Sequence, residues 1–138
     1  MKRYLLDSGV VSDYASAHRG IPQRCEELTK NGNIIGICTP VLGELLGGLE
    51  GSQSRDENLK RFYRIRDRLS MWTFDEKAAI EYGRLWGVLI RKGRLMQKID
   101  VQIAAIAMSL GRTTVVTYDS DLSAVPGLSV ENWLESKS

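Results

Sequence analysis

The 138-residue sequence predicts an α/β fold, with a central parallel sheet of four to five strands between layers of helices. Short apolar runs alternate with longer segments in which apolar residues recur at helical spacing. This alternation favours parallel strands joined by right-handed helical crossovers. The length and the 43% hydrophobic content suit a single domain over residues 1–138, with no repeat or low-complexity tract.

The first predicted strand is the apolar run at residues 4–6, which stops at Asp7. A helix is expected after it, to about Ala17. Pro22 suits the first position of the next helix. That helix is expected to end near Gly32, because glycine accepts the left-handed conformation of a helix end.

The middle of the chain continues the alternation. Residues 34–38 predict a buried strand, and Thr39 followed by proline predicts the N-cap and first turn of a helix through Leu49. The polar segment 51–58 predicts a loop. Apolar residues at helical spacing then predict a helix over 59–70.

The last part of the chain completes the pattern. Residues 71–74 predict a third strand, after which Asp75 can cap a long helix that ends at Gly93. A further helix is expected over 99–110, ending at the next glycine. Two last strands are expected, at 113–117 and around 128–130.

Composition excludes several classes of protein. The net charge is +2, so a nucleic-acid partner requires that the basic residues be clustered. Cys25 and Cys38 are too few for a disulfide framework and suit a reducing cytosol. The apolar stretch 101–110 is too short to cross a bilayer, which takes about 20 residues, and Asp7 interrupts the only apolar run that resembles a signal peptide. We expect a soluble cytoplasmic protein without a membrane segment.

Four acidic residues occupy positions that favour a common site. Asp7 and Asp119 follow predicted strands, at the edge where open parallel sheets bind ligands. Asp100 shares a line of its helix with alanines, and Glu44 lies between small residues of a leucine-rich helix, so both are expected to face inward. Each acid alone has a simpler explanation: a helix cap, a turn residue, or an ion pair such as that of Asp100 with Lys98.

Together, the four carboxylates indicate a metal site. Carboxylates held close together raise one another's pKa and need a cation to stay ionised. Oxygen ligands without cysteine or histidine nearby select Mg²⁺ or Mn²⁺ over zinc. The single histidine, His18, is expected at the surface of the first helix and supports no nucleophilic triad or dyad. Catalysis without a histidine base points to metal-activated water acting on a phosphate.

Four segments resemble the PIN-domain ribonucleases, and most closely the VapC toxins of bacterial and archaeal toxin–antitoxin pairs. They are LLDSG (5–9), TPVLGELLGGL (39–49), KIDVQIAAIAMSLG (98–111) and VVTYDSDLSAVPGLSVENWL (115–134). The resemblance implies a Rossmann-like sandwich whose acids bind one or two Mg²⁺ or Mn²⁺ ions. It places the family's catalytic and metal-binding acids on Asp7, Glu44, Asp100 and Asp119.

The resemblance also implies accessory residues and reveals one departure. Asp121 is an alternative to Asp119 as the fourth acid, and Thr117 matches a family hydroxyl that is expected to hold a carboxylate or a metal-bound water. The family reads Asp-Thr-Asn after the first strand, whereas here Ser8 and Gly9 follow the aspartate. Ser8 keeps the hydroxyl, but Gly9 lacks the asparagine side chain and its hydrogen bonds. We expect activity to survive this change.

The function implied by the resemblance is that of a type II toxin. The expected protein is a Mg²⁺- or Mn²⁺-dependent endoribonuclease that cleaves tRNA or rRNA, forms a homodimer and is silenced by a VapB-type antitoxin. The alternatives are a PIN-fold nuclease outside a toxin–antitoxin pair, another Mg²⁺ enzyme such as a phosphatase or a DNA-directed nuclease, and a non-catalytic binding module. An aspartyl-phosphate phosphatase would require a second aspartate where the chain has Gly9.

Two basic clusters are candidates for RNA binding. Residues 55–68 hold six cations against three acids, and a second set leads toward Asp100. The second set comprises Arg84, Arg91, Lys92, Arg94 and Lys98. A solvated helix face is the alternative for both clusters. The aromatic residues expected in the core or in a dimer interface are Tyr63, Tyr82 and Trp86, and Trp133 is expected to anchor the last segment.

Overall fold

A computed structural model describes residues 1–134, which form a five-stranded, wholly parallel sheet in the order β3-β2-β1-β4-β5. The central strand β1 (Arg3–Leu6) lies between β2 (Ile34–Cys38) and β4 (Thr113–Val116). The edges are β3 (Ser70–Trp72) and β5 (Ser129–Glu131). The predicted parallel α/β fold is therefore confirmed.

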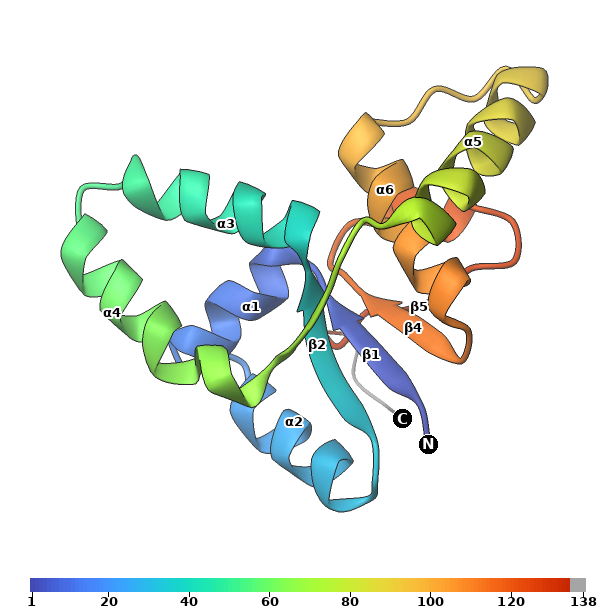
Figure 1. The fold of residues 1–138 in the computed structure, drawn as a ribbon. Helices are drawn as coiled ribbons and strands as arrows, with labels where there is room; N and C mark the ends of the chain where they lie inside the picture. The colour runs from blue at the N-terminus through green and yellow to red at the C-terminus, as the bar shows by residue number, and fades with distance from the viewer. Residues whose placement is uncertain (135–138) are drawn as a thin grey trace.

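Helices cover both faces of the sheet. The chain runs from β1 to β2 to β3 in one direction and then crosses back to β4, so right-handed crossovers place the two sets of helices on opposite faces. Figure 1 shows the first set beside β2 and the second set beyond β1 and β4. The first set is α1 (Ser8–Ala15), α2 (Ile21–Lys30), α3 (Thr39–Glu50) and α4 (Arg55–Ile65), and the second is α5 (Glu76–Arg91) and α6 (Lys98–Leu110).

The core lies in the central strands and in α6. Strand β4 is buried at all of its positions, as expected for a parallel strand that is covered on both faces. On the other side of β1, strands β2 and β3 approach so closely that only glycine fits at position 36. A Cβ atom on Gly36 would lie 2.6 Å from the Ser70 carbonyl oxygen and 2.8 Å from the Trp72 ring.

Several boundaries differ from the prediction. Helix α4 begins at Arg55, so the polar loop spans only 51–54; the acids Asp56 and Glu57 stabilise the first turn of this helix through its dipole. The helix expected over 59–70 ends at Ile65 and continues as a single 3₁₀ turn, η1 (Arg66–Arg68).

The start of α3 also differs. Its N-cap is Cys38, and Thr39 is already helical. The Thr39 hydroxyl instead accepts a hydrogen bond from the Phe74 backbone N–H at 3.3 Å, which ties α3 to the segment after β3. That segment is not part of the strand, since β3 ends at Trp72.

The remaining structural predictions concern single residues. Trp133 is 5% exposed, packs 5.9 Å from the Tyr4 ring and donates its indole N–H to Glu131, which confirms its anchoring role. Cys25 and Cys38 are both buried free thiols. Tyr82 stacks on Trp86 at 5.8 Å in a half-buried pair, whereas Tyr63 is 59% exposed. Within residues 1–134, no helix is both long and apolar enough to span a bilayer.

Candidate metal centre at the carboxyl end of the sheet

The first acid, Asp7, stands at the junction between β1 and α1. Its backbone N–H donates to the Val116 carbonyl, so the ends of β1 and β4 lie side by side. One carboxylate oxygen accepts the Ser8 N–H at 2.8 Å and caps α1. The other accepts the Thr117 hydroxyl at 2.8 Å. Asp7 therefore serves as a helix cap and also points toward β4, where the sheet reverses its winding and ligands bind in this class of fold.

Thr117 connects Asp7 to the acids of the following turn. Its side chain is buried, and its hydroxyl accepts the Asp119 backbone N–H at 3.1 Å while it donates to Asp7. Asp119 in turn accepts the Asp121 N–H at 2.9 Å and caps the 3₁₀ turn η2 (Ser120–Ala124). Asp119 and Asp121 are therefore held on one short turn, and both are exposed.

Asp100 brings the third element to the same place. It lies half-buried in the first turn of α6. Carboxylate oxygens of Asp100, Asp119 and Asp121 lie within 4.8 Å of one another. Burial and then the charges of Asp7, Asp119, Asp121 and Glu44 raise the pKa of Asp100 to about 6. The proposed Lys98 pair is absent: within residues 1–134, no lysine or arginine forms an ion pair with these acids.

Glu44 reaches the site from α3, but it does not face inward as expected. It is exposed, and Ser8 donates its hydroxyl to Glu44 Oε1 at 2.9 Å. The helix buries Val41 and Leu45 on a different face. The neighbouring Gly48 would meet nothing within 4 Å if it carried a Cβ, so the small residues do not mark close packing. Glu44 therefore borders an open site.

The donors at this site fit a divalent cation that prefers oxygen. The Cys38 thiol, whose surroundings include Asp7 and Glu44, is kept protonated because burial raises its pKa to about 12. His18 lies in the turn after α1, not within the first helix as predicted, and its side chain is 67% exposed. The converging ligands are carboxylates, and unpaired carboxylates in this density need a compensating positive charge.

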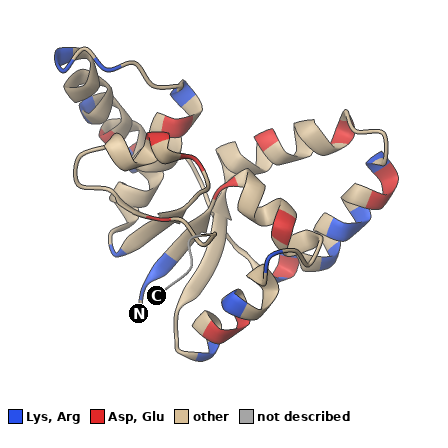
Figure 2. Ribbon diagram, turned by 180° about the vertical axis from the view of Figure 1, so that it is seen from behind, with Lys and Arg blue, Asp and Glu red and all other residues tan. Residues whose placement is uncertain are grey.

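The second basic set runs from α5 across the turn that joins it to α6 and ends at the first residue of α6. Figure 2 shows basic residues on this turn and acidic residues near the start of α6. All five members are exposed: Arg84, Arg91, Lys92, Arg94 and Lys98. Arg84 differs, since its guanidinium is paired with Glu81. In the first basic cluster, Arg55 is likewise paired, with Glu50 and Asp56.

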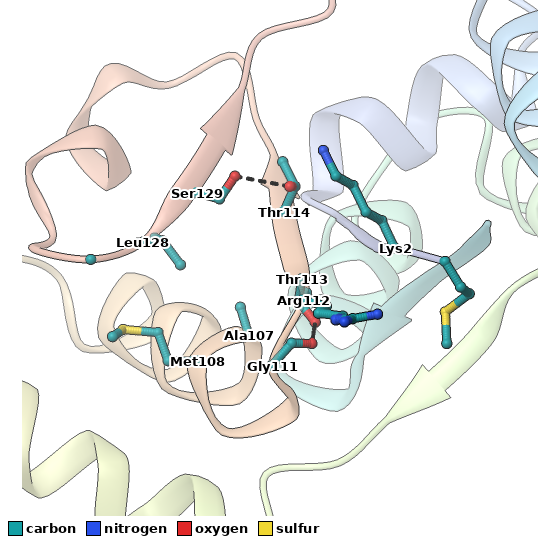
Figure 3. Close-up of a pocket in the computed structure, with 11 residues that line it drawn as sticks. Lys2, Ala107, Met108, Gly111, Arg112, Thr113, Thr114, Leu128 and Ser129 are labelled. Carbon is teal, nitrogen blue, oxygen red and sulfur yellow. Dashed lines mark hydrogen bonds between the residues drawn. The ribbon is translucent and has the colours of Figure 1, made fainter.

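A large pocket lies at the other end of the sheet. It has a volume of about 590 Å³ and opens where β1, β4 and β5 begin (Figure 3). Its lining includes Lys2, Met108, Arg112 and Leu128, and none of the predicted site residues. A smaller cavity, of about 210 Å³, is lined by Thr117, Tyr118 and Asp119 on the acidic side. We therefore assign the candidate site from its converging carboxylates and not from the volume of a pocket.

One contact beside the acids was not predicted. The Tyr118 hydroxyl donates to Asp13 at 2.6 Å, and Arg19 donates to the same carboxylate at 3.2 Å. Tyr118 and Asp13 are 105 positions apart. The only sequence signal was the position of Tyr118, between Thr117 and Asp119.

Comparison with known proteins gives consistent results. The model of the PIN domain family matches residues 4–128. "Ribonuclease VapC2" of Rickettsia felis is 28% identical over 130 residues, covering 94% of this chain and 97% of the relative. "tRNA(fMet)-specific endonuclease VapC" of Salmonella typhimurium is 31% identical over 108 residues, covering 78% and 82%.

Solved structures agree with the sequence relatives. VapBC2 of Rickettsia felis, bound to a DNA fragment from its promoter, superposes with a TM-score of 0.87 at 29% identity, covering 95% of this chain and 98% of that one. DNA-bound VapBC of Salmonella typhimurium superposes with a TM-score of 0.85 at 29% identity, covering 96% and 99%.

Proposed function

The chain belongs to the PIN-domain family and, within it, to the VapC ribonucleases, and on this premise we propose that it cleaves RNA at the carboxyl end of its sheet. One observation carries the proposal: carboxylates from α6 and from the turn after β4 converge within 4.8 Å, with Asp7 beside them. Ion pairing with lysine or arginine does not account for these acids, since the ion pairs of residues 1–134 include none of them.

We assign the metal to four acids, Asp7, Glu44, Asp100 and Asp119, with Asp121 as a further ligand beside Asp119. When bound, Mg²⁺ or Mn²⁺ would lower the pKa of a water and stabilise the negative charge that develops on the phosphate. The residues around the ligands orient them. Ser8 donates to Asp7 and to Glu44, and Thr117 donates to Asp7. These hydrogen bonds hold the carboxylates in place before metal or RNA arrives.

The RNA is expected to approach over the turn between α5 and α6. Its exposed cations lead to the start of α6, which carries Asp100. They would contact phosphates on either side of the cleaved bond and confer a strong dependence on salt. In-line attack by water would leave a 5′-phosphate and a 3′-hydroxyl. A relative named for initiator tRNA supports a structured RNA, either tRNA or rRNA, as the substrate class.

The biological role follows from the relatives. Two of the similar solved structures are VapBC assemblies. We assign this chain the toxin role in such a type II pair, as a cytoplasmic homodimer that a VapB-type antitoxin silences. Residues 1–138 would form a single PIN domain.

The test is expression of the chain alone in bacteria, followed by mapping of new 5′ ends in cellular RNA. Growth arrest with discrete new ends is expected, and neither should appear with Asp7→Asn or Asp100→Asn, which keep the shape of the side chain. Circular dichroism checks that both variants are folded. Undiminished cleavage by either variant contradicts the assignment of the site. If the wild-type chain causes neither growth arrest nor new 5′ ends, a binding module on the same fold is favoured.

A further inference from the structure

Three side chains form a second polar cluster beside the acidic turn. Asp13 accepts the Tyr118 hydroxyl at 2.6 Å and an Arg19 N–H at 3.2 Å, both on the same oxygen. The Arg19 guanidinium also lies over the Tyr118 ring, 5.5 Å from its centre. The Asp13 side chain is only 13% exposed. Hydrogen bonds to a charged acceptor in such a setting are strong ones.

The cluster joins the two elements that carry the acids. Asp13 lies on α1, the helix that Asp7 caps. Tyr118 lies in the chain between Thr117 and Asp119, at the start of the acidic turn. The hydrogen bond from Tyr118 to Asp13 therefore ties the acidic turn to α1, the helix that begins directly after Asp7.

The backbone that presents Arg19 is strained. Arg19 has φ of 58° and Ala17 has φ of 55°, both in the left-handed region that side chains other than glycine seldom adopt. Such strain persists where surrounding contacts determine the conformation. Here those contacts are the ion pair with Asp13 and the stacking on Tyr118.

The Tyr118 ring also lies beside Gly9, the position at which the sequence departs from the Asp-Thr-Asn pattern. A Cβ atom on Gly9 would lie 3.4 Å and 3.7 Å from two ring carbons, which is ordinary contact. Gly9 is exposed, so a longer side chain at this position could extend into solvent beside the ring.

We propose that Tyr118 is a positioning residue, which Asp13 and Arg19 hold in place so that the Asp119–Asp121 turn presents its carboxylates to Asp100. The proposal rests on the proposed function, since its readout is metal binding at those acids.

The direct test is Mn²⁺ titration of the full chain by calorimetry, comparing wild type with Tyr118→Phe. Loss of the hydroxyl should weaken Mn²⁺ binding roughly tenfold, the size of one charge-assisted hydrogen bond. Cleavage should need correspondingly more Mn²⁺ but reach nearly the wild-type kcat at saturation. Tyr63→Phe, which alters an exposed ring on α4, is the matched control and should bind as wild type does.

A stability control separates positioning from simple destabilisation. Cys25→Ala removes a buried side chain from α2, away from the turn, and should lower the melting temperature without changing Mn²⁺ affinity. The proposal is overturned if Tyr118→Phe binds Mn²⁺ as tightly as wild type, or if Cys25→Ala weakens binding to the same extent.

A parallel titration of Asp100→Asn distinguishes failure of the positioning role from failure of the proposed function. If wild type binds Mn²⁺ and Asp100→Asn does not, while Tyr118→Phe matches wild type, only the positioning role fails. If wild type neither binds Mn²⁺ nor cleaves RNA, the proposed function fails with it.

Discussion

The two ends of the same sheet show opposite ways of treating polar groups. At the amino end, where the pocket lies, polar groups have partners: the Thr114 and Ser129 hydroxyls are 2.9 Å apart, and Thr113 donates to the Gly111 carbonyl at 2.8 Å (Figure 3). At the carboxyl end, carboxylates share a small space without a lysine or arginine partner among residues 1–134, and the pKa of Asp100 rises to about 6. The crowding of like charges therefore supports the proposed site at the carboxyl end, whereas the larger pocket lies at the other end.

The largest expected effect comes from removing one acid at the carboxyl end. Asp100→Asn should lower kcat/KM for RNA cleavage by about a hundredfold or more, because a ligand and its charge are lost. Thr114→Val, at the amino end, is the matched substitution and should leave cleavage within a factor of about two. Equal losses in the two variants would abolish the distinction between the ends.

Next in size is the loss of a hydrogen bond that orients an acid. Thr117→Val removes the donor to Asp7 and should lower Mn²⁺ affinity by about tenfold, within the range for such outer partners. Thr117→Ser keeps the hydroxyl and should restore most of the affinity. The measurement is Mn²⁺ titration by calorimetry, and a Thr117→Ser variant as impaired as Thr117→Val would show that the methyl group, not the hydroxyl, matters.

A smaller effect is expected from the exposed cations of the α5–α6 turn. Arg91→Gln or Arg94→Gln should raise KM a few fold and reduce the slope of log(kcat/KM) against log[salt] by about 1. Arg84→Gln should change the slope less, since Glu81 already pairs with Arg84. Arg112→Gln, beside the pocket, should not change it. Cleavage assays over a salt series test these expectations, and an unchanged slope in both turn variants would remove the turn from the RNA path.

The smallest effect concerns the stability of the metal-free protein. Because the folded state raises the pKa of Asp100 from 3.8 to about 6, the carboxylate destabilises the fold above pH 6 and is relieved as pH falls toward 4. Asp100→Asn should therefore melt a few degrees higher than wild type at pH 7, and the difference should narrow at pH 5. Thermal melts in chelator test this, and a difference that widens toward pH 5 would contradict the assigned shift.

Periodicity predicted the elements well but not which face of each helix is buried. Asp7 and Asp119 could be placed near one another because strand ends are visible in the sequence and parallel strands end at one edge. The prediction that Glu44 faces inward was wrong. Four-residue spacing identifies residues on one line of a helix, but only the packing of α3 decides whether that line meets the core. The α4 start was missed because its first turn is entirely polar.

The choice between Asp119 and Asp121 could not be made from the sequence for a different reason. The short turn brings the carboxylates of both residues close to Asp100, so either one could serve as the fourth acid. No pattern in the sequence predicted the hydrogen bond from Tyr118 to Asp13, because it joins the side chains of residues that are 105 positions apart. Contacts of this kind depend on the completed fold.

The buried hydroxyl of Thr117 makes the site observable by spectroscopy. Thr117 is 2% exposed, and its hydroxyl donates to Asp7 while it accepts from the Asp119 N–H. A hydroxyl proton in that position exchanges slowly with water and gives its own resonance in a proton NMR spectrum. Its frequency depends on the charge that Asp7 presents, so an added diamagnetic cation such as Mg²⁺ should move this one line and report occupancy without any assay of RNA.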